Sequence, residues 1–401
     1  MKILSHGHVL GGAFLIAGTS IGAGMLALPI VSAMGGFLPS ILIYIICWAI
    51  MSATGLLFLE ISLTMKKGSN IISMADKYLG RGGKIFSWII YLFLFYCLLI
   101  AYISGGGAFI KSIVGDAISL NLAAIIFAVI FGSIVYIGAL AIDRLNILLM
   151  IGLLISYFLF IIFGAKHVDI LNLLHMQPKA AVFAFPVILL SFGYQGIIPS
   201  LTYYMKKDYK KIRAAIILGT SLAFLVYLVW ELLILGIIPL EGKFGLKEAI
   251  GQGGDAISLF KSYTNIKAVY YVGQFFSFFA ITTSFLGVSM GLFDFIADGF
   301  RIQKKGIKKL LIALITFLPP IAITLINPHL FLTALNYAGG IGGALLLILL
   351  PTIMVFSKRY IKKEKDLHQL FGGKVVLFII SIFVVFVLFT EIFQEISKIV
   401  T

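Results

Sequence analysis

The sequence predicts an all-α membrane protein with about eleven transmembrane helices. Of its 401 residues, 61% are hydrophobic and only 12% are charged, whereas soluble domains carry about 25% charged residues. A soluble fold could not hide this much apolar surface, because its exterior needs polar residues. The apolar residues also form continuous runs of roughly 20 residues, whereas the strands of a membrane barrel alternate over about ten. Lipid is therefore the expected solvent of almost the whole chain.

Each predicted span is an apolar run of the length that a membrane requires. A helix needs about 20 residues to cross a hydrocarbon core of about 30 Å. The runs cover residues 9–33, 37–64, 85–110, 120–141, 145–165, 180–204, 214–239, 268–299, 310–326, 330–356 and 375–394. The first run is too long and too rich in glycine for a cleaved signal peptide, so we expect it to be a span. The eighth is long enough to extend beyond the bilayer.

Basic residues set the expected orientation. The chain has 31 Lys and Arg against 16 Asp and Glu, a formal net charge of +15. Of these 31 basic residues, 23 lie before the first span or in loops that follow even-numbered spans, which leaves 8 elsewhere. The positive-inside rule places such loops, and hence the N-terminus, in the cytoplasm and the C-terminus outside. The net charge then reflects topology, and no nucleic-acid partner is needed to explain it.

Two spans carry helix-breaking residues near the membrane centre. The first reads AGTSIGAGMLALP over 17–29, and the sixth reads PVILLSFGYQGIIP over 186–199. Unwound backbone in a membrane is tolerated only where it is buried in protein or lines a cavity. The two spans are five helices apart and so run in opposite directions. This pattern is typical of a transporter built from inverted repeats, here 1–165 and 180–356, followed by an extra helix at 373–401.

The breaks expose backbone groups suited to a zwitterion. The freed N–H groups start a half-helix, where donors and dipole both favour a carboxylate. They belong to Ala23, Gly24 and Met25. The freed carbonyls, near Ala17, Gly18 and Ser191, can hold an ammonium group or a cation. The alternative is that small residues such as Gly18 and Gly22 only permit close helix packing.

Six segments occur in a specific order along the chain. They are GTSIGAGMLALP (18–29), YLGR (78–81), AYISG (101–105), SFGYQGIIPS (191–200), TSFLGVSMGLFD (283–294) and TFLPP (316–320). In this order they resemble the hydroxy/aromatic amino acid permease family of bacteria, especially its tyrosine- and tryptophan-specific members. The resemblance implies a LeuT-like fold in the bacterial cytoplasmic (inner) membrane and import of an aromatic amino acid, usually with protons. The chain departs from the family at Gln195, where members carry His, and near Leu153, where they carry Lys, so the coupling ion stays open between proton and sodium.

The substrate is expected at mid-membrane between spans one, three, six and eight. The candidate binding residues are Thr19, Ser20, Gly22, Ala23, Gly24, Tyr102, Ser191, Phe192, Gly193, Tyr194 and Gln195. Those of span one would cradle the carboxylate and those of span six would face them. Phe192 and Tyr194 would stack on an aromatic ring. Tyr102 would cap the carboxylate or gate the pocket, unless it only bonds between helices.

The ion-coupling candidates are the ionisable and hydroxyl groups inside the spans. Glu231 lies deep in span seven, where a carboxyl group is functional by default, and it is the proton candidate. On span eight, Thr283 and Ser284, beside Thr282, would coordinate sodium or else bond back along their own helix. The remaining candidate is Asp294. Together with Asp298 and Glu60 it lies near a cytoplasmic helix end, where it pairs with a basic loop or takes part in an inner gate.

The remaining features predict no enzyme and no cofactor. Cys47 and Cys97 lie in apolar runs and are expected to be small buried hydrophobes. The six histidines form no metal-binding pattern, and the glycine-rich segment 251–254 lacks the Lys-Ser/Thr of a phosphate loop. We expect an aromatic amino acid and the lipid bilayer as partners, and no obligate protein partner. The alternatives are a sodium-coupled or exchange carrier for other neutral amino acids and, from different classes, a channel or a membrane-embedded enzyme.

Overall fold

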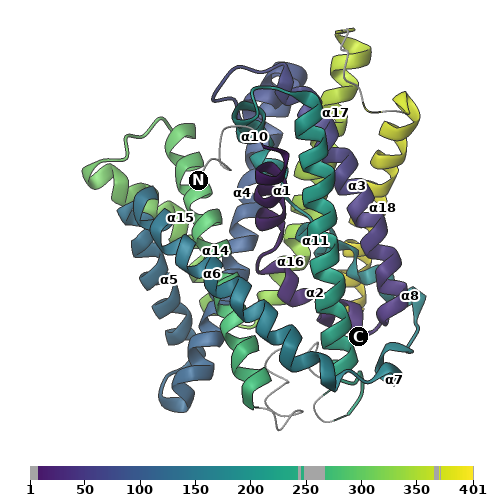
Figure 1. Cartoon of the computed structure of the whole chain (residues 1–401). Coiled ribbons are helices and arrows are strands. Elements are labelled where there is room, and N and C mark those ends of the chain that lie inside the picture. The colour runs from purple at the N-terminus through teal and green to yellow at the C-terminus, as the bar shows by residue number, and fades with distance from the viewer. Residues whose placement is uncertain (1–7, 243–244, 248–266, 365–369, 371, 401) are drawn as a thin grey trace.

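The computed structural model describes residues 8–242, 245–247, 267–364, 370 and 372–400. Within these ranges every regular element is a helix and no strand occurs (Figure 1). Among the described residues, ten helices are long and apolar enough to cross a membrane, and a bent helix pair near the N-terminus brings the total to 11. The prediction of an all-α membrane protein with about eleven spans is confirmed. The glycine-rich segment 251–254, which lacks the sequence of a phosphate loop, lies outside the described residues.

The helices follow the predicted order of spans. The first span is the pair α1 (Val9–Ser20) and α2 (Gly24–Ala33), bent by 59°. Spans two to five are α3 (Phe37–Leu63), α4 (Ile71–Val114), α5 (Leu120–Ile137) and α6 (Ala139–Gly164). Span six contains α8 (Pro178–Ala181), α9 (Phe185–Ser191) and α10 (Ile198–Tyr204), after the short α7 (Ile170–Leu173). Spans seven to nine are α11 (Tyr209–Ile237), α14 (Lys267–Gly299) and α15 (Gly306–Ile326). Span ten joins α16 (Phe331–Tyr337), η5 (Ala338–Leu349), α17 (Leu350–Phe356) and η6 (Ser357–Ile361), and the last span is α18 (Gly373–Val400).

Local capping explains where several helices begin. Asn70 and Ser73 form a reciprocal capping box at the start of α4, so this helix begins well before the predicted span at 85. Gly80, with φ of 70°, kinks the chain before it enters the membrane. Asp208 caps α11 by accepting a hydrogen bond from the backbone N–H of Lys211 at 3.1 Å. This hydrogen bond, which favours the charged form, lowers the pKa of Asp208.

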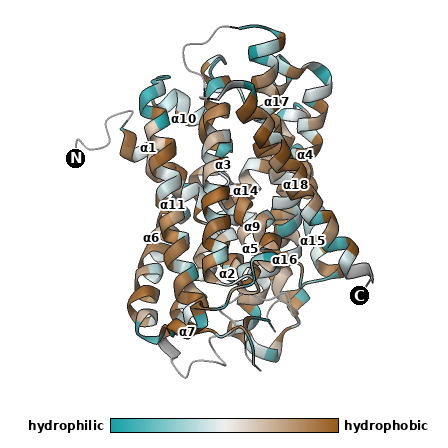
Figure 2. Ribbon diagram, turned by 90° about the vertical axis from the view of Figure 1, so that its right-hand side faces the viewer, coloured by the Kyte–Doolittle hydropathy of each residue, from teal (hydrophilic) through white to brown (hydrophobic). Residues whose placement is uncertain are grey.

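The outer surface of the bundle is apolar, as a lipid-facing surface must be. On α6, for example, Ile147, Leu148 and Phe158 are all more than half exposed. Figure 2 shows hydrophobic ribbon through the middle of the molecule and hydrophilic segments at its two ends. The loops that carry the predicted cytoplasmic basic clusters lie together at one end, the upper end in Figure 1. We call this end the basic face.

Span ten departs from regular α-helix. Residues Ala338–Leu349, which include four glycines, form a π-helix, although runs of that length are rare. The close approach of α9 requires glycine here, because a β-carbon at Gly339 would lie 1.9 Å from the carbonyl oxygen of Pro186. Spans six and ten are therefore packed backbone against backbone beside the second break.

Candidate functional site

The first break separates α1 from α2. The helix ends at Ser20, and Ile21 adopts an extended conformation with φ of −73° and ψ of 99°. The chain resumes helical geometry at Ala23 and Gly24. The 59° bend leaves the carbonyl end of α1 and the N–H end of α2 close to each other in the middle of span one, as the glycine pattern predicts.

The second break interrupts span six after Ser191. Phe192 and Tyr194 leave the helical region, with φ and ψ of −85° and 11° and of −144° and −4°. The chain then resumes as a single 3-10 turn, residues 195–197, followed by α10. Both predicted interruptions are therefore present, and each lies between two half-helices.

The two breaks touch each other. A β-carbon at Gly24 would lie 2.9 Å from the Ser191 hydroxyl and 3.5 Å from its α-carbon. From α11, the buried Tyr227 hydroxyl lies 2.6 Å from the carbonyl oxygen of Ser20 and 2.6 Å from that of Ser191. The carbonyl ends of α1 and α9 thus meet at a single tyrosine.

Spans three and eight complete the site. Ser284 of α14 accepts a hydrogen bond from the backbone N–H of Ala23 at 3.0 Å. A β-carbon at Gly22 would lie 2.5 Å from the same hydroxyl oxygen, so glycine is required for this contact. The buried Tyr102 hydroxyl lies beside Ser284. Residues from spans one, three, six and eight are therefore together, as predicted, and span seven adds Tyr227.

Two residues of the second break do not face the first. The Tyr194 ring lies over Gly55 of α3 and its hydroxyl donates to the Met51 carbonyl at 3.1 Å. The buried Gln195 amide donates to Thr54 Oγ1 at 3.1 Å. The expected orientation differs because a buried amide must find hydrogen-bond partners, and α3 offers them where Gly55 leaves room for the ring.

The other candidates of spans one and six lie at the site or beside it. Thr19 is exposed and its hydroxyl bonds back to the Leu15 carbonyl at 2.8 Å. The buried Ser20 hydroxyl has no hydrogen-bond partner among the described residues. Phe192 is fully buried, and its ring meets that of Tyr227 edge to face at 5.1 Å. Gly193 lies in the unwound segment.

Glu231 is fully buried on α11, one helical turn beyond Tyr227. Its Oε2 accepts a hydrogen bond from the Tyr44 hydroxyl at 3.0 Å. Its Oε1 has no hydrogen-bond partner among the described residues, although the Ser32 hydroxyl lies close to the carboxyl group. Sequence reasoning missed Tyr44 and Tyr227. One signal could have found Tyr227, which lies four residues before an intramembrane acid and so on the same helix face.

The hydroxyl and acidic candidates of α14 differ in their partners. Thr283 bonds back to the carbonyls of Phe279 at 2.9 Å and Ala280 at 3.1 Å. Asp294 forms a half-exposed ion pair with Lys304 at 2.6 Å. Both contacts match the alternatives to ion coupling that the sequence left open. For Thr283 the alternative was bonding along its own helix, and for Asp294 it was pairing with a basic loop.

One side of α14, which we call the strip, leads from the breaks toward the basic face. On α14, helical spacing places Ser284, Gly287, Asp294 and Asp298 along one side. Gly287 is exposed, as is Gly196 beside α10, and no atom lies within 4 Å of a β-carbon built at either. The lipid-facing positions are instead large and apolar. Open space therefore lies beside Gly287 and beside Gly196, on the basic-face side of the two breaks.

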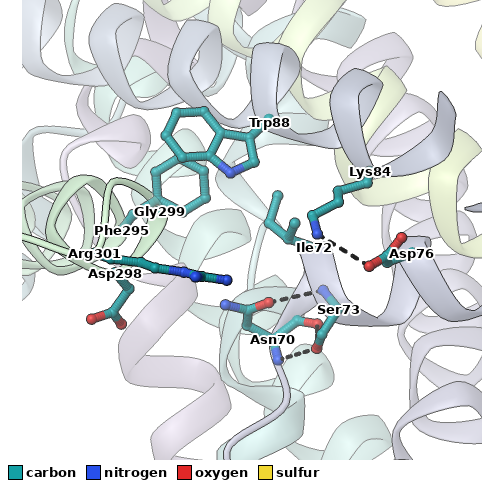
Figure 3. Close-up of a pocket in the computed structure, with 10 residues that line it drawn as sticks. All are labelled: Asn70, Ile72, Ser73, Asp76, Lys84, Trp88, Phe295, Asp298, Gly299 and Arg301. Carbon is teal, nitrogen blue, oxygen red and sulfur yellow. Dashed lines mark hydrogen bonds and ion pairs between the residues drawn. The ribbon is translucent and has the colours of Figure 1, made fainter. Parts of the chain in front are cut away.

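A cavity of about 260 Å³ lies at the end of this strip, between the start of α4 and the end of α14 (Figure 3). Lys84 and Asp76 form an ion pair at 3.2 Å on one side of it. The Arg301 side chain extends into the cavity toward Asn70, and the Trp88 ring forms part of its wall. Four charged residues line the cavity, Asp76, Lys84, Asp298 and Arg301, and Asp298 also belongs to the strip.

Comparison with known proteins agrees with this architecture. The family model described as "Tryptophan/tyrosine permease family" matches residues 5–391. The chain belongs to the tryptophan/tyrosine permease family. Its relatives include the tryptophan-specific transport protein of Haemophilus influenzae, 32% identical and covering 94% of this chain and 93% of the relative. The tyrosine-specific transport system 2 of the same organism is 35% identical, covering 82% and 83%. The low affinity tryptophan permease of Escherichia coli (strain K12) is 33% identical, covering 96% of each chain.

Membership in the tryptophan/tyrosine permease family makes this chain a multi-pass bacterial membrane transport protein and not an enzyme. The family named by the resemblance is thereby confirmed. In this permease, the two breaks and the groups around them form the candidate transport site.

Replacing Gly24 by valine is expected to reduce substrate binding about 10- to 100-fold. The added side chain overlaps Ser191, and overpacking of this kind costs about 1–3 kcal/mol, where 1.4 kcal/mol is tenfold in affinity. The matched control is Gly18→Val, because a β-carbon there meets only Met150 Cε at 3.8 Å. The affinities of both purified variants are measured by binding of labelled tyrosine and tryptophan. Equal affinities of the two variants would contradict the contact between the breaks.

Proposed function

We propose that this permease imports tyrosine, tryptophan or both by secondary active transport, with proton symport and alternating access around the two breaks. The observation that carries the proposal is the contact between two oppositely directed spans at the points where each is interrupted. The names of the relatives supply the substrate class. In this proposal 1–165 and 180–356 are inverted repeats of a LeuT-like fold, 373–401 is an added helix, and the basic face is cytoplasmic.

The zwitterion fits between opposite helix ends. The start of α2 presents the backbone N–H groups of Gly22 and Gly24 to the carboxylate, with the positive end of the α2 dipole behind them. The N–H groups of Ala23 and Met25, also expected to be free, donate instead to the Ser284 hydroxyl and the Gly22 carbonyl. The carbonyl ends of α1 and α9, at Ser20 and Ser191, attract the ammonium group. Tyr102 and Phe192 border the site and are the groups proposed to contact the substrate carboxylate and ring.

Proton coupling is the form of energy input that the contacts favour. Glu231 is a fully buried carboxyl group close to the breaks, and a buried acid in a span is a natural proton carrier. Two hydroxyls of the alternative sodium site have partners, Thr283 along its own helix and Ser284 with the Ala23 amide. The Thr282 hydroxyl is buried without a hydrogen-bond partner among the described residues, so the uptake experiment also tests the sodium alternative. The open space beside Gly287 and Gly196 supports release of substrate on the side of the basic face.

Uptake into proteoliposomes tests the proposal. With labelled tyrosine or tryptophan, we expect saturable uptake driven by an inward proton gradient, and competition between the aromatic amino acids. A sodium gradient alone should produce no accumulation, and empty liposomes provide the baseline. Accumulation that required sodium would contradict proton symport, uptake of small neutral amino acids only would contradict the substrate class, and flux that never saturates would indicate a channel.

A further inference from the structure

The Tyr227 hydroxyl has an unusual pair of partners. It lies 2.6 Å from the carbonyl oxygen of Ser20 and 2.6 Å from that of Ser191, and the tyrosine is fully buried. A phenol has one proton to donate. Only one of the two carbonyl oxygens can receive this proton at a time. The other carbonyl oxygen then lies 2.6 Å from the phenol oxygen without receiving a proton from it.

The position of this hydroxyl carries negative potential. Ser20 and Ser191 are the last residues of α1 and α9, and the final carbonyls of a helix lack helical donors. Each helix end also carries the negative end of its dipole. Two such ends converge on one point, where a group with positive charge and several donors would be more favourable than a single neutral hydroxyl.

An ammonium group meets this requirement. It supplies three N–H donors and a full positive charge, so it can satisfy both carbonyls simultaneously. A phenol satisfies only one of them. An aromatic acid that lacks the amino group supplies no donor here at all.

Resting on the proposed transport function, we propose that the Tyr227 hydroxyl holds the place of the substrate ammonium group in the empty site. The arriving ammonium group displaces the hydroxyl from the Ser20 and Ser191 carbonyls. Tyr227 is thus a specificity-determining residue: it joins the two half-helix ends while the site is empty, and it yields only to a ligand that replaces its hydrogen bonds. A ligand without an amino group leaves the hydroxyl in place.

The Tyr227→Phe variant separates this role from the alternatives. It removes the competing donor but keeps the ring and its contact with Phe192. The ligands are tyrosine and 3-(4-hydroxyphenyl)propionic acid, which has the same ring and carboxylate without the amine. We expect Tyr227→Phe to bind tyrosine about threefold to tenfold more tightly than wild type, as for one competing hydrogen bond. Binding of the desamino acid should change less than twofold.

Tyr157→Phe is the matched control. Tyr157 is also buried and also donates to a backbone carbonyl of α11, that of Val226 at 2.9 Å, but this carbonyl lies inside a helix and not at a half-helix end. Both dissociation constants should be unchanged in this variant. Thermal unfolding gives a second readout: tyrosine should raise the melting temperature of Tyr227→Phe more than that of wild type, because the empty variant lacks the bridge.

Other outcomes would overturn the inference. Equal weakening of both ligands would show that Tyr227 contacts the substrate, and unchanged affinities with an unchanged ligand-induced shift in melting temperature would show a bridge that persists in the bound state. These results would leave the proposed transport function intact. Wild-type protein that bound neither tyrosine nor tryptophan would instead refute the proposed function, and this inference with it.

Discussion

Glu231→Gln is expected to abolish proton-driven accumulation of tyrosine and tryptophan while their binding and exchange persist. Glutamine has the shape of glutamate, and its Oε1 can still accept the hydrogen bond from the Tyr44 hydroxyl that reaches Glu231 at 3.0 Å. The amide cannot take up or release a proton. One coupled proton supports about tenfold accumulation per pH unit, because 1.36 kcal/mol corresponds to one such unit. The variant should therefore reach only the concentration of the external medium.

The measurement compares net uptake and exchange in the same proteoliposomes. Asp143→Asn is the matched control, because Asp143 is exposed at the start of α6 and the change also converts an acid to its amide. The control should accumulate substrate like the wild type. Accumulation by Glu231→Gln under a proton gradient would exclude Glu231 as the coupling group, and loss of exchange as well as accumulation would assign it a role in binding or folding.

Glu60→Gln is expected to destabilise the protein by about 3–5 kcal/mol, the cost of removing one partner from a buried ion pair. Glu60 is almost fully buried, and so are the two cations that contact it. The Arg359 Nε donates to Glu60 Oε1 at 3.0 Å and a second guanidinium nitrogen donates to Oε2. Lys358 Nζ lies 3.5 Å from Oε1. The amide would leave these cations without their carboxylate.

The exposed pair of Asp294 and Lys304 gives the comparison. Both side chains are 40% exposed and the pair is 2.6 Å long, and surface pairs of this kind contribute about 0–1 kcal/mol. In thermal unfolding in detergent, the melting temperature should fall clearly for Glu60→Gln and hardly at all for Asp294→Asn. Replacing Arg359 by glutamine in the Glu60→Gln background should restore part of the lost melting temperature. Similar melting temperatures for both single variants would show that Glu60 is solvated and contributes no buried pairing.

The predicted spans and breaks depend on short-range properties of the chain. A run of about 20 apolar residues must cross lipid wherever it occurs, so the eleven spans could be predicted without any knowledge of their neighbours. Glycine and proline weaken a helix locally, so the interruptions at 17–29 and 186–199 could also be predicted. The early start of α4 was not, because the amphipathic segment after Asn70 is too polar to count as a span.

Predictions of side-chain direction were less successful, because they depend on which helix lies opposite. Tyr194 and Gln195 follow the break, but their side chains point toward α3. The Tyr194 ring packs over Gly55 and its hydroxyl donates to the Met51 carbonyl, and the Gln195 amide donates to Thr54. Thr283 and Ser284 are neighbours in the sequence, yet one bonds along its own helix and the other reaches the Ala23 amide. Nothing in the local pattern distinguishes the two.

The sequence by itself determined that this protein crosses a membrane about eleven times, is helical, and is interrupted in its first and sixth spans, because solvent and backbone propensity act residue by residue. Only the tertiary structure decided that the two interruptions touch and that Tyr227 joins their carbonyl ends. It also decided that Glu231 is buried against Tyr44. These groups come from spans far apart in the chain, and their distances follow from how the helices pack against one another.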